Sequence, residues 1–188
     1  LNNFTNDPKY MNNIITGDKA LTLMDKQTLV IVVDTHRRSM VEFEEVLSAS
    51  KSIVLIDHHR RSEDFIDNAV LTYHEPYASS ACEMVTEILQ YIQDNPKIGL
   101  KEAEALYAGI FLDTKGFTFK TGVRTFEAAA YLRRMGVDPV NIRRLFKTDI
   151  RDSVRLSKVI SSAKIYRDNI AVAVCEDTGK DLQVLVAK

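Results

Sequence analysis

Acidic and histidine side chains stand where three apolar segments of the sequence end. Asp34 and Asp57 each end a short strand-like run, His58 and His59 follow Asp57 directly, and Asp113 follows an apolar helical segment. Carboxylate and imidazole groups together suit Mn²⁺, Zn²⁺ or Fe²⁺. Three carboxylates and two imidazoles could hold a two-metal centre, which binds phosphoryl oxygens and lowers the pKa of a bridging water. The pattern therefore indicates phosphoester hydrolysis.

Two hydrophobic periods alternate around the first two acids. Residues 28–34 (TLVIVVD) and 52–57 (SIVLID) are short, β-branched and almost continuously apolar, which predicts strands buried on both faces. Residues 39–49 have helical spacing, with Ser39 as a candidate N-cap. Strand, helix and strand in about 30 residues predict a βαβ unit with a parallel sheet. The carboxyl ends of neighbouring parallel strands meet at one edge, so the acids and histidines should gather there.

The rest of the chain continues the α/β pattern. We predict a further short strand over 70–74, helices over 79–92, 100–112 and 124–135, a new helix after Asp138 and Pro139, and a hairpin from 161–166 and 170–175. The helix over 100–112 is apolar enough to be expected in a buried position. The fold class is α/β, a parallel sheet flanked by helices and followed by the beginning of a small α/β domain. The expected domains are 1–150, a linker helix over 151–160, and 161–188.

Other polar residues leave two interpretations open. Ser79 and Ser80 precede a helix, where Ser80 with Glu83 could form a capping box, or the helix N-terminus could receive phosphate. Arg124 could neutralise a substrate phosphate or be solvated surface charge. The same choice applies to two neighbouring cations, Lys115 and Lys120.

A purely structural role is also an alternative for the candidate metal ligands and the nearby histidines. An Asp at the end of a strand is often only a helix cap, and His36 and His74 could be ordinary loop histidines near the expected site. The combination of strand-terminal acids, a histidine pair and a helix-terminal acid in one α/β pattern nevertheless favours a site.

Charge and hydropathy narrow the classes of partner. The formal net charge is −1, so the chain lacks the basic field that tracks a long nucleic acid, while a small phosphorylated ligand remains compatible. No apolar run approaches the roughly 20 residues of a membrane span. The apolar stretch near Lys188 and the start at Leu1 suggest a fragment of a longer protein.

Three motifs in this order resemble the DHH phosphoesterase superfamily: VVDTH, LIDHH and FLDTKGF. Two longer blocks, EPYASSACEMVTEIL and FLDTKGFTFKTGVRTFEAAAYLRRMGVDP, are most similar to the GdpP-type cyclic-di-AMP phosphodiesterases. The resemblance covers residues 16–188. It implies a manganese-dependent hydrolase that converts cyclic-di-AMP to linear pApA with a water activated by two Mn²⁺ ions.

The resemblance also implies a role for each motif residue. Asp34 is expected to bridge the two Mn²⁺ ions, and His58 and Asp113 to ligate one of them. His59 is expected to contact the scissile phosphate or help protonate the leaving oxygen, and Asp57 to orient the histidine pair. Ser79, Ser80 and Arg124 are the candidate substrate-binding residues. Residues 161–188 resemble the start of a DHHA1 substrate-binding domain.

Two motifs of the family do not occur in the sequence. The family's first motif, a His followed by Asp-x-Asp, has no counterpart before Asp34, and residues 1–33 contain no His. The Gly-Gly-Gly-His motif of DHHA1 is also absent. These 188 residues alone are therefore expected to bind Mn²⁺ poorly and to turn over little substrate.

The family further implies a larger parent protein. It would have two transmembrane helices, a PAS domain and a degenerate GGDEF domain, and would hold this part on the cytoplasmic side of the bacterial membrane. Whether the protein is a homodimer is left open by the sequence. The alternatives are another DHH activity (a short-oligonucleotide exonuclease, a RecJ-type nuclease or a pyrophosphatase) and a catalytically incomplete nucleotide-binding module.

Overall fold

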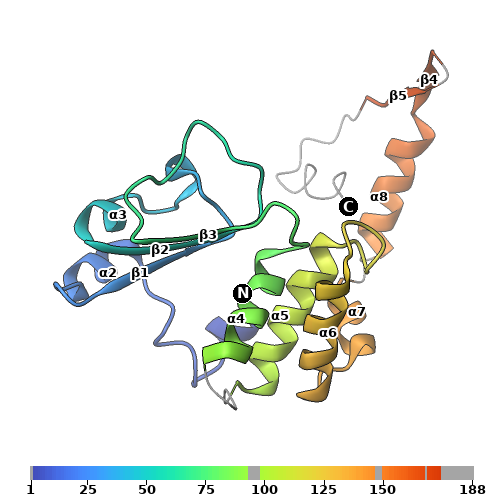
Figure 1. Ribbon diagram of the computed structural model, residues 1–188. Coiled ribbons are helices and arrows are strands. Elements are labelled where there is room, and N and C mark those ends of the chain that lie inside the picture. Colours follow the sequence, from blue (N-terminus) through green and yellow to red (C-terminus); the bar gives the residue numbers. More distant parts are fainter. Residues whose placement is uncertain (1, 93–97, 147–149, 168, 175–188) are drawn as a thin grey trace. The chain divides into compact units, whose positions relative to one another are not determined.

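A computed structural model describes residues 2–92, 98–146, 150–167 and 169–174. The first part of the chain forms a three-stranded sheet made of β1 (Leu29–Val33), β2 (Ser52–Asp57) and β3 (Leu71–His74), in that order (Figure 1). Both strand pairs are parallel, with Val33 beside Ile56 and Asp57 beside His74. The predicted α/β class, the parallel sheet and all three strands are confirmed. All three strands therefore end at the same edge.

The side chains of β2 alternate between two hydrophobic clusters, as the period of a strand requires. On one face, the cluster consists of the buried side chains of Val32, Leu47, Ile53, Leu55 and Ile66. On the other face, Ile56 packs with Ala78 and Met84, and Met84 belongs to helix α4 (Ala81–Ile92). The central strand is thus covered on both sides, which fixes the position of Asp57 at its end.

Strand β1 differs from the prediction that both its faces are buried. Val32 is buried, but the side chains of Leu29, Ile31 and Val33 on the other face are about half exposed, at 51%, 55% and 50%. In the described part of the chain β1 is an outer strand of the sheet, paired only with β2. The sequence could not predict the exposed face, because a continuous apolar run looks the same in an inner and in an outer strand.

The predicted helix over 39–49 is shorter in the structure. A 3₁₀ turn, η1 (Arg38–Met40), is followed by α3 (Glu45–Ala49). The backbone amides of Arg38 and Ser39 donate to the carboxylate of Asp64, both at 3.2 Å, and the Ser39 hydroxyl also donates to it. Ser39 therefore binds a distant loop instead of capping a helix, and the helix begins only at Glu45.

Three helices follow the sheet in the chain and pack on one another: α4, α5 (Leu100–Asp113) and α6 (Val123–Arg134). α4 also packs against β2. A Cβ atom on Gly109 would lie 2.2 Å from Cys82 Sγ, so a larger residue where α4 and α5 approach closely would have to displace the Cys82 side chain. α5 buries Ala103, Tyr107 and Ile110, whereas Leu112 is 60% exposed, so the expected buried position holds for one face of the helix.

Two short helices, α1 (Asn2–Thr5) and α2 (Gly17–Leu23), precede the sheet, and α2 contacts α3. After α6, Gly136 has a φ of 102°, a conformation that glycine adopts readily and that commonly follows a helix. The first compact unit of the chain ends at Asp138.

The second compact unit begins at Pro139. It contains α7 (Pro139–Leu145), α8 (Ile150–Ser161) and the antiparallel pair of β4 (Lys164–Tyr166) and β5 (Ile170–Val172). The predicted helix after Pro139 and the hairpin are confirmed. The boundary at residue 150 stays a prediction, and residues 175–188 of the expected DHHA1-type segment lie outside the described residues. No helix in the described part combines the length and the hydrophobicity of a membrane span.

Candidate metal centre

Asp34 follows β1 at the carboxyl edge of the sheet. Its amide donates to the Ile56 carbonyl at 3.0 Å, which continues the ladder between β1 and β2 by one residue. Its φ is 64°, in the left-handed region, where a residue other than glycine costs about 1 kcal/mol. This turn leaves the carboxylate 59% exposed, beside the end of β2. The strained backbone at a polar strand end is typical of a functional position.

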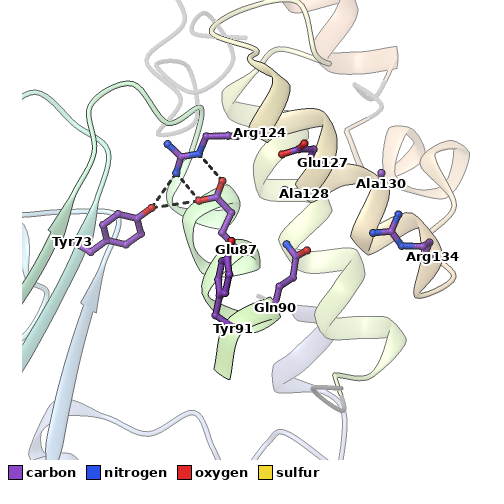
Figure 2. Close-up of a pocket in the computed structure, with 9 residues that line it drawn as sticks. All are labelled: Tyr73, Glu87, Gln90, Tyr91, Arg124, Glu127, Ala128, Ala130 and Arg134. Atoms are coloured by element: carbon purple, nitrogen blue, oxygen red, sulfur yellow. Dashed lines mark hydrogen bonds and ion pairs between the residues drawn. The ribbon is translucent and has the colours of Figure 1, made fainter. Parts of the chain in front are cut away.

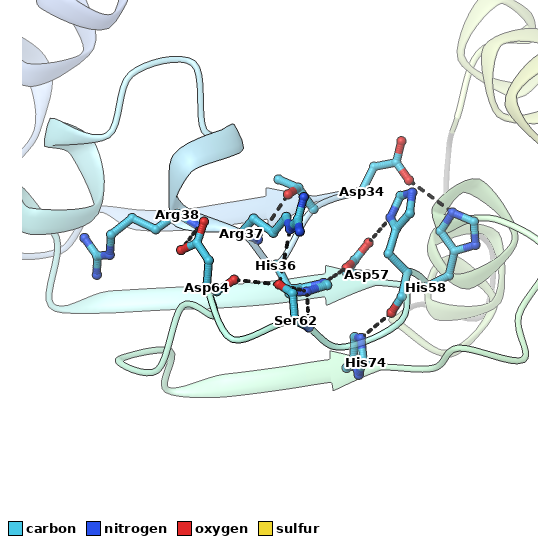
Figure 3. Close-up of polar contacts among 11 residues, drawn as sticks. Asp34, His36, Arg37, Arg38, Asp57, His58, Ser62, Asp64 and His74 are labelled. Carbon is cyan, nitrogen blue, oxygen red and sulfur yellow. Dashed lines mark hydrogen bonds and ion pairs between the residues drawn. The ribbon is translucent and has the colours of Figure 1, made fainter. Parts of the chain in front are cut away.

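His58 joins two carboxylates that come from different elements. Its Nε2 atom lies 3.4 Å from Asp34 Oδ1 and 3.7 Å from Asp113 Oδ2 (Figure 3 includes the pair with Asp34). The His58 side chain is only 9% exposed, whereas Asp113 is 35% exposed at the end of α5. The structure thus brings together three of the residues that the sequence singled out, over 79 positions of the chain.

The electrostatics of these three groups favour a cation among them. Hydrogen bonding to Asp34 raises the pKa of His58, although burial lowers it, and the charge of Asp113 raises it further. Burial and the nearby charge of Asp34 raise the pKa of Asp113 above its ordinary value. Asp113 is therefore a carboxylate that gains from a positive charge placed beside it.

The donor set fits a divalent metal ion. One ligand atom each from Asp34, His58 and His59 lies within 4.8 Å of the others. Carboxylate oxygen and imidazole nitrogen are ligands for Mn²⁺ and for neighbouring metals of the series. Asp113, also within reach of His58, adds a third element to the site. The turn after it, where Lys115, Gly116 and Phe117 all have positive φ, ends α5 sharply at this acid.

Asp57 occupies a different position from the three converging groups. Its side chain is completely buried, and its two oxygens accept hydrogen bonds from His36 Nδ1 at 2.5 Å and His59 Nδ1 at 2.7 Å. Burial raises the pKa of Asp57, but the hydrogen bonds from His59 and His36 outweigh it, so that the pKa is lowered overall. Asp57 is thus a buried carboxylate whose two oxygens are each hydrogen-bonded to an imidazole.

His36 and His74, for which the sequence left both interpretations open, lie beside this carboxylate. His36 is 2% exposed, and the centroid of its ring lies 5.3 Å from the centroid of the His74 ring. His74 Nε2 donates to the His59 backbone carbonyl at 2.6 Å. Ser62, which no motif of the sequence marks, contacts His36 through both its amide and its hydroxyl. A serine in a loop carries no sequence signal for such a contact.

Ser79 and Ser80 are both buried, at 2% and 0% exposure. Ser80 Oγ accepts from the Glu83 amide at 3.0 Å, which is the hydrogen bond of an N-cap. Ser79 Oγ donates to Glu83 Oε2 at 2.5 Å. The capping interpretation of Ser80 is therefore present in the structure, while the substrate-binding role of the two serines stays a prediction.

Arg124 contacts residues other than the three converging groups. Its guanidinium donates to Glu87 and Tyr73, and these three residues line a cavity of about 670 Å³ (Figure 2). Tyr91, Glu127 and Arg134 also line this cavity, so its lining includes two arginines and two glutamates. Asp34, His58 and Asp113 are not among the residues that line this cavity. The expected substrate contact of Arg124 stays a prediction.

Known proteins resemble this chain over most of its length. It is 47% identical over 174 residues to the cyclic-di-AMP phosphodiesterase GdpP of Geobacillus thermodenitrificans, and these residues cover 93% of the chain and 26% of that protein. It is 43% identical over 173 residues to the cyclic-di-AMP phosphodiesterase PdeA of Listeria monocytogenes, with 92% and 26% covered. The chain thus spans about a quarter of the length of these relatives.

A solved structure agrees in fold. The crystal structure of an exopolyphosphatase-related protein from Bacteroides fragilis superposes with a TM-score of 0.74 at 22% identity, over 88% of this chain and 50% of that one. Residues 4–110, more than half of the chain, match the DHH family, N-terminal domain. The resemblance carried by the motifs around Asp34, Asp57 and Asp113 is therefore confirmed, and the chain belongs to the DHH family.

Proposed function

We propose that this chain carries the metal centre of a phosphodiesterase that hydrolyses cyclic-di-AMP to linear pApA with two Mn²⁺ ions. The observation that supports this most directly is the convergence of His58 with the carboxylates of Asp34 and Asp113, within 3.7 Å of its Nε2 atom. The substrate is inferred from the two relatives, which are cyclic-di-AMP phosphodiesterases.

In this proposal Asp34, His58 and Asp113 would be the ligands that this chain contributes to the two ions. When bound, the ions supply an activated water and a positive charge for the phosphoryl oxygens. The exposed carboxylate of Asp34 and the half-exposed ring of His59 leave the site open to a small phosphorylated ligand.

His59 is the proposed group for the scissile phosphate or for protonation of the leaving oxygen. Its Nδ1 atom donates to Asp57, so Nε2 is the nitrogen that can face a substrate. Asp57, completely buried, orients this ring without reaching the substrate itself. Ser79, Ser80 and Arg124 are proposed to contribute to substrate binding.

The cellular setting is part of the same proposal. The chain spans 26% of each relative. In this proposal the rest of the protein supplies the remaining ligands and a membrane anchor, and the whole protein is a homodimer on the cytoplasmic side. Fractionation of cells that produce the tagged full-length protein tests the anchor. Recovery in the supernatant would contradict it.

The test of the activity is hydrolysis of cyclic-di-AMP in Mn²⁺ by the full-length protein and by its His58→Ala variant. Linear pApA and pyrophosphate are run beside it. Cleavage of the cyclic substrate in preference to both, lost in the variant, is the expected result. Preference for the linear dinucleotide or for pyrophosphate would contradict the substrate, and no cleavage by the metal-loaded protein would contradict the enzyme.

A further inference from the structure

His36 is buried between the metal centre and the loop that follows β2. Its Nδ1 atom lies 2.5 Å from Asp57 Oδ2, and its Nε2 atom lies 3.0 Å from the Ser62 amide nitrogen and 2.9 Å from Ser62 Oγ (Figure 3). Both ring nitrogens are therefore engaged, and the ring is 2% exposed. Such a ring has a fixed orientation.

The partners of His36 determine where its proton lies. A backbone amide can only donate, so the Ser62 amide requires a bare, accepting Nε2 on His36. The proton of the neutral ring must then be on Nδ1, from which it donates to Asp57. The Ser62 hydroxyl donates its single proton to the Asp64 carbonyl, at 3.0 Å, so the amide is the Ser62 group that donates to His36. The loop thus selects one tautomer of His36.

Asp57 transmits this orientation to His59. One oxygen of its carboxylate accepts from His36, and the other accepts from His59 Nδ1 at 2.7 Å. A carboxylate bound on one oxygen only could rotate, whereas two hydrogen bonds fix its plane. The ring of His59 is therefore held with Nε2 turned away from Asp57.

A second metal site is the competing explanation, because ligand atoms of His36, Asp57 and His74 lie within 4.8 Å of one another. Each of these groups already has hydrogen-bond partners that account for it. Both nitrogens of His36 and both oxygens of Asp57 are used, and His74 donates to the His59 carbonyl. The cluster is satisfied by hydrogen bonds alone.

We propose that His36 is a positioning residue for the hydrolysis: through Asp57 it holds His59 in the orientation that faces the scissile phosphate. This role rests on the proposed function. It concerns a residue that neither binds the metal ions nor touches the substrate. Its loss should therefore affect the rate of the chemical step more than the binding of either.

The experiment compares His36→Leu with His36→Asn in the full-length protein. Leucine removes the donor, whereas the asparagine amide nitrogen takes the place of Nδ1 and can still donate to Asp57. His36→Leu is expected to lower kcat for cyclic-di-AMP by about 10- to 100-fold, the usual effect of removing such a supporting hydrogen bond, and His36→Asn to recover most of it. KM and the Mn²⁺ content should change little.

Two further measurements separate positioning from stability. Ser50→Ala removes hydrogen bonds to the Thr28 and Ser52 carbonyls at the opposite end of β2, and is expected to lower the melting temperature with an unchanged kcat. If leucine prevents folding, His36→Gln replaces it, because glutamine places its amide nitrogen near Nε2 and not near Nδ1. His36→Asn should then retain more activity than His36→Gln.

The tautomer can be measured without substrate, by ¹⁵N NMR of the histidine side chains. Protonation of His36 on Nδ1 alone is expected, and protonation on Nε2 would overturn the proposal. Equal kcat values for wild type and His36→Leu, or no recovery by His36→Asn, would also overturn it. An inactive wild-type protein would instead overturn the proposed function, and this role with it.

Discussion

Arg124 binds the carboxylate of Glu87 through two hydrogen bonds, from Nε to Oε1 at 2.7 Å and from Nη2 to Oε2 at 2.6 Å. The same Nη2 atom lies 3.0 Å from Tyr73 Oη, so the contact joins α6, α4 and β3. Glu87 is 19% exposed, and hydrogen bonding to it raises the pKa of Arg124. The guanidinium is therefore already paired within the first unit.

Replacing Glu87 with glutamine should destabilise the protein. Loss of the charged, two-point contact is expected to lower the free energy of unfolding by about 1 kcal/mol, the upper end for ion pairs that are partly exposed. Urea denaturation measures this. Glu44→Gln is the control, because its single contact with Arg38 is long, at 3.4 Å, and more exposed. Equal midpoints for the two variants would contradict the structural role of the pair.

The fold was predictable where a local pattern decides the structure. Residues 52–57 form β2 with the predicted bounds, because a β-branched apolar run in a covered strand has few alternatives. The helix over 39–49 was not, because the amides of Arg38 and Ser39 are bound by Asp64, about 25 residues away. A contact between distant residues leaves no trace in the local period.

The contacts of the candidate site also fall into a part that the sequence predicts and a part that it does not. The meeting of Asp34 with His58 follows from the parallel strands, whose ends lie at one edge of the sheet. The hydrogen bonds of His36 to Asp57 and Ser62 depend on the path of the loop after β2 and on side-chain rotamers. Neither the loop path nor the rotamers can be derived from sequence spacing. The role of His36, as a site residue or as an ordinary loop histidine, therefore stayed open.

Removal of a proposed metal ligand should abolish stabilisation by Mn²⁺. For the full-length protein, Mn²⁺ at 100 times its dissociation constant is expected to add about 2.7 kcal/mol to the free energy of unfolding. Asp34→Asn and His58→Ala should lose most of this gain, whereas His59→Ala should keep it and lose turnover. Thermal denaturation with and without Mn²⁺, together with the bound metal measured by mass spectrometry, checks both. Loss of metal in His59→Ala would make His59 a ligand.

The N-terminus of α4 provides a prediction about stability. Ser80→Ala removes the acceptor for the Glu83 amide, which is buried with it, and is expected to cost about 1 kcal/mol. Ser80→Asn keeps an acceptor and should restore part of the loss. Chemical denaturation of the two variants measures the difference. An unchanged Ser80→Ala with weaker substrate binding would favour the ligand role over the cap.

Glu102 on α5 should make stability depend on pH in the acid range. Hydrogen bonds from Tyr10 at 2.5 Å and from Lys9 at 3.0 Å help to lower its pKa from 4.5 to about 2. Because the folded pKa lies below the ordinary one, this contribution is complete above pH 4.5 and is lost as the pH falls towards 2. Glu102→Gln should therefore be less stable than wild type near pH 6 and approach it near pH 2.

Melting temperatures measured across this pH window test the prediction for Glu102. Glu104→Gln removes a carboxylate two residues further along the same helix and controls for the change in net charge. The difference between wild type and Glu102→Gln should shrink as the pH falls, while Glu104→Gln should follow the wild-type curve. A constant difference at all pH values would mean that the carboxylate of Glu102 is not held by Tyr10 and Lys9 in solution, and that the N-terminal segment docks on α5 by other contacts.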